Sequence, residues 1–127
     1  MKKILIVIAD YYADISSSLL KSAKNNLNDF SLKIIRVPGV FEIPTTISKN
    51  IKKYDAFIAL GCVIKGETPH FDFISLAATN GIMTLSIDHK KPIANGIITS
   101  LNQKQALIRS KKKGGEAARA IVSILSQ

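Results

Sequence analysis

The stretch Ile4-Leu5-Ile6-Val7-Ile8-Ala9 decides the fold of this chain. It is a continuous apolar run, rich in β-branched residues, without the alternating polar positions of a strand that faces water. Such runs are typical of central strands in parallel sheets, because helices cover both faces of the strand. The run is also too short to cross a bilayer. We therefore expect it to be a buried strand.

Three later segments repeat this apolar character, and amphipathic stretches separate them. Strands are predicted at 32–37, at 56–60 continuing to 64, and at 93–98, where Asn95-Gly96 weakens the pattern. Helices are predicted where apolar residues recur every three or four positions. Their markers are Ile15, Leu19, Ala23 and Leu27; Ile43, Ile47 and Ile51; Phe71, Ile74 and Ala78; and Ala117, Ile121 and Leu125.

Four strand–helix repeats predict a parallel sheet with helices on both faces. We therefore expect one α/β domain over residues 1–127, built on a four-stranded parallel sheet. The helix starts are expected at Asp14 as a cap, at Pro44 in a first turn, and at a capping box of Ser100 and Gln103. Only the secondary structure of residues 82–87 stays open, since their β-branched content fits either a strand or the end of the preceding helix.

The composition limits the classes of molecule that the chain is expected to bind. A chain of 127 residues fits one domain, and its 46% of hydrophobic residues can bury a core while leaving apolar surface that favours an oligomer. Its net charge of +9 could serve a nucleic acid, a membrane surface or a phosphorylated substrate. The basic residues are scattered, with a run only at 111–113, and no aromatic residues interleave with them. We therefore expect no nucleic acid and no membrane as partner, and a phosphorylated small-molecule substrate stays open at this point.

A single cysteine, Cys62, excludes an internal disulfide and a multi-cysteine metal site. It lies at the end of a predicted buried strand, so we interpret it as a small apolar residue and not as a nucleophile. With no signal peptide in the sequence, we expect a cytoplasmic protein.

Unusual residues follow three of the predicted strands. In open parallel sheets, ligands bind at the carboxyl ends of the strands. The segments 10–12, 38–42 and 65–70 all follow such ends, so we expect them to converge on one edge. Gly66, Thr68 and His70 suit a phosphate at a helix N-terminus with a proton-transfer group beside it. The alternative is a surface loop with a capping threonine and an incidental histidine.

Two aromatic residues lie in these segments. Tyr11 and Phe41 could sandwich a flat heterocycle, or they could be ordinary core residues. Glu42 could accept hydrogen bonds from a ligand, or it could be a solvated carboxylate. Arg109 and Lys113, near the end of the chain, could reach a phosphate, although charged helix faces are usually solvated. His89 is expected at the surface.

Two long segments carry a family resemblance. They are Val37-Pro38-Gly39-Val40-Phe41-Glu42-Ile43-Pro44 and Leu60-Gly61-Cys62-Val63-Ile64-Lys65-Gly66-Glu67-Thr68-Pro69-His70-Phe71-Asp72. Both closely resemble the signature segments of lumazine synthases, and the match runs in order from Ile4 to the last helix. The resemblance implies a flavodoxin-like three-layer α/β/α sandwich. It also implies condensation of 5-amino-6-(D-ribitylamino)uracil with 3,4-dihydroxy-2-butanone 4-phosphate, the penultimate step of riboflavin biosynthesis, by a transferase without metal or cofactor.

The resemblance also implies the roles of particular residues. Tyr11 would stack on the pyrimidine ring, and His70 would transfer protons. Arg109, from the neighbouring subunit of a pentamer, would pair with the substrate phosphate, with Lys113 beside it. The remaining substrate-binding residues would be Val40, Phe41 and Glu42 around the ribityl chain and ring, Val63 and Ile64 at the ring edge, and Lys65, Gly66, Glu67 and Thr68 around the phosphate.

The sequence departs from the family pattern at three places. Asn95 stands where many members have a phenylalanine that covers the ring from the adjacent subunit, and Asp10 and Tyr12 replace a common Arg and Asn. The stretch between Arg109 and Lys113 is several residues shorter than usual. The assembly is expected to be a pentamer or a pentamer-based shell, and the start of the chain close to its first strand favours the isolated pentamer.

Two other functions compete with the enzyme. A flavin- or lumazine-binding module that lost the reaction would fit Asn95 and Asp10, and it would bind lumazine without turnover. A basic nucleic-acid binder would fit only the net charge, and its binding would fall steeply with salt.

Overall fold

The computed structural model describes residues 1–66 and 69–127. Its elements alternate as the sequence predicts. They are β1 (Lys3–Ala9), α1 (Ala13–Lys24), β2 (Ser31–Val37), the 3-10 turn η1 (Val40–Glu42), α2 (Ile43–Asn50), β3 (Ala56–Ile64), α3 (His70–His89), β4 (Ile93–Ser100) and α4 (Gln103–Leu125).

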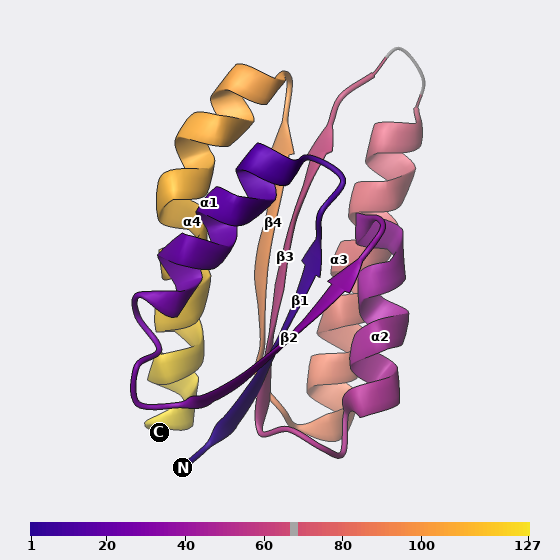
Figure 1. Cartoon of the computed structure of the whole chain (residues 1–127). Helices are drawn as coiled ribbons and strands as arrows, with labels where there is room; N and C mark the ends of the chain where they lie inside the picture. The colour runs from indigo at the N-terminus through magenta and orange to yellow at the C-terminus, as the bar shows by residue number, and fades with distance from the viewer. Residues whose placement is uncertain (67–68) are drawn as a thin grey trace.

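The four strands form one parallel sheet in the order β2-β1-β3-β4. Helices α1 and α4 cover one face, and α2 and α3 cover the other (Figure 1). The expected flavodoxin-like three-layer sandwich is therefore confirmed. Strands β2 and β4 form the free edges of the sheet, whereas β1 and β3 lie between them.

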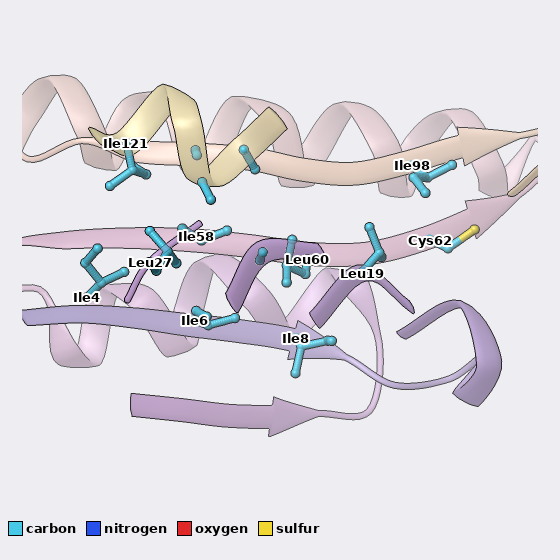
Figure 2. Packing of buried hydrophobic residues seen from close by; sticks show 14 of the residues in the cluster. Ile4, Ile6, Ile8, Leu19, Leu27, Ile58, Leu60, Cys62, Ile98 and Ile121 are labelled. Carbon is cyan, nitrogen blue, oxygen red and sulfur yellow. The ribbon is translucent and has the colours of Figure 1, made fainter. Parts of the chain in front are cut away.

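Alternate residues of the central strands supply two cores. On the α1–α4 face, Ile4, Ile6 and Ile8 of β1 pack with Ile58 and Leu60 of β3, as Figure 2 shows. On the other face, Leu5 and Val7 pack with Phe57 under α2 and α3. The opening apolar run is fully buried because each of its residues belongs to one of these cores.

The open segment 82–87 is helical and belongs to α3. Ile82 is buried against the sheet, whereas Met83 and Ile87 are exposed, so the segment follows the helical period and not the strand period. The helix continues to His89 and ends at Lys90, whose φ of 53° is left-handed. His89 is exposed, as expected.

Two predicted caps are wrong. Helix α1 begins one residue before Asp14, and its cap position is Tyr12, which makes no side-chain cap hydrogen bond. Helix α4 is capped by Asn102, whose side chain accepts a hydrogen bond from the Gln105 amide at 2.9 Å. Ser100 remains in β4, because its carbonyl accepts a hydrogen bond from the Lys65 amide of the neighbouring strand end. Pro44 lies in the first turn of α2, as predicted.

Candidate active site

The connections after β1, β2 and β3 leave the same edge of the sheet, which is the upper edge in Figure 1. Main-chain hydrogen bonds tie them to neighbouring strands. The Asp10 amide donates to the Val37 carbonyl at 3.2 Å, and the Lys65 amide donates to the Ser100 carbonyl at 2.9 Å. The predicted convergence of the three segments at one edge is therefore present.

The first connection presents an exposed aromatic ring. Tyr11 is 76% exposed, and its ring contacts that of Tyr12 edge to face, with centroids 4.9 Å apart. Tyr12 is half-buried and packs against the core under α1 and α4. The hydroxyl of buried Ser16, in the first turns of α1, lies 2.9 and 3.0 Å from the carbonyl oxygens of Ala9 and Tyr12 and shares its one proton between them. The backbone on both sides of Tyr11 is therefore held.

The second connection combines a buried and two exposed side chains. Val40 is 5% exposed and packs in the core under α2 and α3, whereas Phe41 is 58% exposed and Glu42 is also exposed. A Cβ on Gly39 would come within 3.0 Å of a Glu42 carboxylate oxygen, so glycine leaves room for that carboxylate. Phe41 is thus not a core residue, and an aromatic ring and a carboxylate are both available to a ligand.

The third connection carries polar groups outward from β3. Val63 and Ile64 are half-buried and pack against opposite cores, and Lys65 and Gly66 are exposed. Glu67 and Thr68, the predicted phosphate-binding residues, lie outside the described part of the chain. Helix α3 begins at His70, which is exposed.

The remaining predicted site residues are Asn95 and Arg109, at the free edge formed by β4, and Lys113, further along α4. The Phe57 amide donates to the Pro92 carbonyl and the Lys65 amide to that of Ser100, so the even-numbered residues of β4 face β3. The odd-numbered residues, including Asn95 and Thr99, therefore direct their main-chain groups away from the sheet. The Arg109 guanidinium donates to the Thr99 carbonyl at 2.6 Å, and the Asn95 side-chain oxygen accepts from the Ile97 amide at 3.0 Å.

Two of these residues lie far from the carboxyl edge. Asn95 pairs with Ala59 in the middle of β3, five residues before the end of β4, which corresponds to about 17 Å of strand. Lys113 follows the start of α4 by ten residues, or about 15 Å of helix. One chain therefore does not bring Asn95 and Lys113 to the segments that carry Tyr11 and His70.

The pKa values of two groups at the site, buried Cys62 and half-buried Tyr12, are shifted. Burial raises the pKa of Cys62 to about 11, against the opposing effect of Arg109. Burial, followed by Cys62 and Tyr11, raises the pKa of Tyr12. Both groups are therefore protonated near neutral pH, and Cys62 is a packed thiol, not a nucleophile.

The sequence reasoning missed Ser16 and Thr99. Ser16 lies on the apolar face of α1, one residue after Ile15, and a polar residue on such a face requires a partner. That position was the available signal. No comparable signal marks Thr99, because its role lies in a main-chain carbonyl that every residue type carries.

Among residues 1–66 and 69–127, no three His, Cys, Asp or Glu side chains gather as metal ligands. Within the same ranges, no helix combines the length and apolar character that a membrane span needs.

Comparison with known proteins gives a consistent result. The model of the 6,7-dimethyl-8-ribityllumazine synthase family matches residues 1–127. A 6,7-dimethyl-8-ribityllumazine synthase of Zymomonas mobilis is 40% identical over 99% of this chain and 96% of its own length. Those of Rhodopseudomonas palustris (strain BisA53) and Agrobacterium fabrum are 41% and 40% identical, over 95% and 96% of this chain and 82% and 91% of their own lengths. The chain belongs to the 6,7-dimethyl-8-ribityllumazine synthase family.

Proposed function

We propose that residues 1–127 form one lumazine synthase domain that condenses 5-amino-6-(D-ribitylamino)uracil with 3,4-dihydroxy-2-butanone 4-phosphate. The products are 6,7-dimethyl-8-ribityllumazine, phosphate and water. Family membership makes the chain a transferase of the penultimate step of riboflavin biosynthesis. The observation that carries the site assignment is the convergence of both signature segments and the Tyr11 connection on one sheet edge.

The pyrimidine substrate is assigned to the first two connections. The exposed rings of Tyr11 and Phe41 offer π faces to a flat heterocycle. The exposed Glu42 carboxylate accepts hydrogen bonds from ribityl hydroxyls or ring N–H groups. Val40 is buried, so its contribution comes from its main chain. Val63 and Ile64, half-buried at the end of β3, supply an apolar wall at the ring edge.

The phosphate substrate is assigned to 65–68 and the start of α3. Helix N-termini bind phosphate through free amides and the macrodipole, and exposed Lys65 adds positive charge. Among residues 1–66 and 69–127, a Cβ at Gly66 would meet nothing within 4 Å, so these residues leave the backbone there accessible to a ligand. Glu67 and Thr68 belong to this group by their match to the signature segment.

The reaction needs orientation and proton transfer more than covalent help. The amine of the pyrimidine attacks the ketone and water leaves, phosphate is then eliminated, and the second amine closes the ring on the remaining carbonyl with loss of water. Holding both substrates together lowers such barriers by roughly 7–11 kcal/mol in good cases. His70, exposed at the same edge, exchanges protons with the reacting amine and the leaving group. A positioned acid–base group typically contributes about 10²- to 10⁴-fold.

The site is completed by a second copy of the chain. Arg109 and Asn95 lie at the outer edge of β4, and Lys113 and Asn95 are far along their elements from the carboxyl edge. These residues suit the site of a neighbour better than that of their own chain. The arrangement is a head-to-tail interface, which closes into a ring such as a pentamer or a pentamer-based shell.

Helix α3 supports this assembly. Phe73, Leu76, Met83 and Ile87 are each at least 58% exposed, and their spacing places them on one face of a helix that is also apolar toward the sheet. Exposed apolar side chains gathered on one helix face normally mark an interface, so a neighbouring copy of the chain is the proposed cover.

The cytoplasmic location stays a prediction of the sequence.

The decisive experiment mixes the purified protein with both substrates and follows the fluorescence of the lumazine. Product formation well above the uncatalysed rate supports the enzyme. A folded oligomer that binds lumazine tightly without accelerating its formation would instead favour the binding module.

Complementation tests whether sites are shared between chains. His70→Ala and Arg109→Ala are each expected to be strongly impaired. Dissociating and reassembling an equal mixture should recover about a quarter of the wild-type activity. Each site takes His70 from one chain and Arg109 from its neighbour, and in a random mixture one head-to-tail interface in four has both residues intact. No recovery from mixed, reassembled oligomers would contradict shared sites.

A further inference from the structure

We propose that Tyr12 and Ser16 are positioning residues that restrict the ring of Tyr11 at the carboxyl edge of the sheet and so set the affinity for the pyrimidine substrate. This inference rests on the proposed function, in which Tyr11 stacks on that substrate. Neither residue is expected to touch the reacting atoms.

Tyr11 needs such support because its side chain projects from the sheet. It is 76% exposed, and an exposed side chain loses rotamer freedom when a ligand fixes it. The ring of Tyr12 lies against it at an interplanar angle of 76° and a centroid distance of 4.9 Å, which is the favoured edge-to-face geometry. This contact restricts Tyr11 before the substrate arrives.

Tyr12 can act as a support because it is itself anchored. Its side chain packs against the core under α1 and α4, and its main chain forms the cap position of α1. That core includes Cys62 near the end of β3, while the edge-to-face contact joins the Tyr12 ring to the exposed ring of Tyr11. The support therefore connects the candidate binding ring to the rigid centre of the sheet.

Ser16 fixes the backbone that carries both rings. Its hydroxyl reaches the carbonyl of Ala9, the last residue of β1, and that of Tyr12, the cap of α1. Its amide also donates to the Tyr12 carbonyl at 2.9 Å. The two acceptors stand on either side of Asp10 and Tyr11, so one buried side chain clamps the whole connection.

Packing alone does not explain a serine at this position. Ser16 is 3% exposed on a helix face shared with Ile15 and Leu19. Alanine would fill the space with a better helix propensity and no polar group to bury. What the serine adds is a hydroxyl donor for the two carbonyl acceptors at the β1–α1 connection.

The test compares Tyr12→Ala, Tyr12→Phe and Ser16→Ala by steady-state kinetics and near-ultraviolet circular dichroism. Tyr54→Ala is the matched control, since Tyr54 makes a similar edge-to-face contact, with Phe57, at the opposite edge of the sheet. The chain has three tyrosines and no tryptophan, so the near-ultraviolet signal reports tyrosine rings. Ser16→Ala keeps all three tyrosines, and a smaller signal there reports loosened rings.

We expect Tyr12→Ala to raise KM for the aminouracil about three- to tenfold, the effect of ordering one free side chain, with kcat within about twofold of wild type. Tyr12→Phe should restore the wild-type KM because it keeps the ring. Ser16→Ala should raise KM and weaken the dichroism, whereas Tyr54→Ala should lower thermal stability without changing KM.

An unchanged KM in both Tyr12→Ala and Ser16→Ala, or a loss confined to kcat, would overturn the inference. If Tyr12→Ala does not fold, Ser16→Ala alone decides the question. An inactive wild-type protein would count against the proposed function instead. Undiminished dichroism in Ser16→Ala would still overturn the positioning role in that case.

Discussion

The guanidinium of Arg109 donates a hydrogen bond of 2.6 Å to the main-chain carbonyl of Thr99. The bond joins α4 to the outward side of the edge strand β4, just before the strand ends at Ser100. Since a guanidinium has five N–H donors in a fixed plane, one bond orients the group, and its other donors make no hydrogen bond with residues 1–66 or 69–127. Arg109 is thus oriented before any phosphate arrives.

Arg109→Lys should therefore be a damaging substitution although it conserves charge. A lysine ammonium lacks the planar fork that Thr99 orients. Because hydrogen bonds to charged groups contribute about 1.5–3 kcal/mol, we expect kcat/KM to fall about 10- to 100-fold, mainly through KM for the phosphate substrate. Arg119→Lys, an exposed change on the same helix, is the control and should behave as wild type. Equal kinetics for the two variants would refute the role of the Thr99 contact.

Gly114→Ala should disrupt the contact between α1 and α4. A Cβ at Gly114 would overlap the Leu19 carbonyl oxygen and approach the Ala23 amide nitrogen to 2.9 Å, and both are main-chain atoms that cannot rotate away. Overpacking of this kind costs about 3 kcal/mol or more. Urea unfolding measures the loss. Gly66→Ala, where a Cβ meets no atom of the described part of the chain within 4 Å, should change stability by less than about 1 kcal/mol.

The alternation of strands and helices was predictable because burial on both faces of β1 and β3 leaves continuous apolar runs in the sequence. The helix starts were less predictable, because long-range pairing competes with local capping signals. Ser100 has the residue type of a cap, yet its carbonyl pairs with the Lys65 amide and keeps it in β4. The secondary structure of residues 82–87 was hard to predict for a similar reason. The same residue type is buried by the sheet at Ile82 and exposed at Ile87, and only the folded structure distinguishes the two positions.

The segments of the candidate site were predictable to different degrees. Parallel topology alone brings Tyr11, Phe41 and His70 to one edge, because each follows the carboxyl end of a strand. The position of Asn95 depends on the register between β3 and β4, which no local pattern encodes. The support of Tyr11 by Tyr12 and Ser16 depends on side-chain orientations that appear only when the β1–α1 connection is folded.

Lys91→Met should destabilise the fold although lysines usually lie in solvent. The Lys91 ammonium donates to the carbonyls of Ile51 and Tyr54 at 2.6 and 2.9 Å, which ties the end of α3 to the connection between α2 and β3. We expect a loss of about 2–4 kcal/mol, because two charged hydrogen bonds disappear and two carbonyls lose their partner. Thermal or urea unfolding checks this. A variant as stable as wild type would show that water replaces the ammonium.

Substitution of the preceding residue, Lys90, should raise the stability of the fold. Lys90 has a φ of 53° at the end of α3, a left-handed conformation that costs a residue with a Cβ roughly 1 kcal/mol. Lys90→Gly should therefore raise the free energy of unfolding by up to about 1 kcal/mol. A loss of stability would mean that the flexibility of glycine in the unfolded chain outweighs the relief of strain.

Cys62 should make the stability of the protein depend on alkaline pH. Burial raises the pKa of its thiol from 9.0 to about 11, so between these values the folded chain holds a proton that the unfolded chain has released. The free energy of unfolding then falls as pH rises, because the unfolded state binds fewer protons. The contribution of the Cys62 thiol to the free energy of unfolding is complete below pH 9 and lost above pH 11, and its size is roughly 2–3 kcal/mol.

Cys62→Ala lacks this dependence, so the difference in unfolding free energy between wild type and variant should shrink from pH 8 to pH 11. Urea titrations of both proteins under reducing conditions measure it. Parallel pH profiles would contradict a buried, protonated thiol, whereas converging profiles would confirm that Cys62 is packed as part of the core beneath the candidate site.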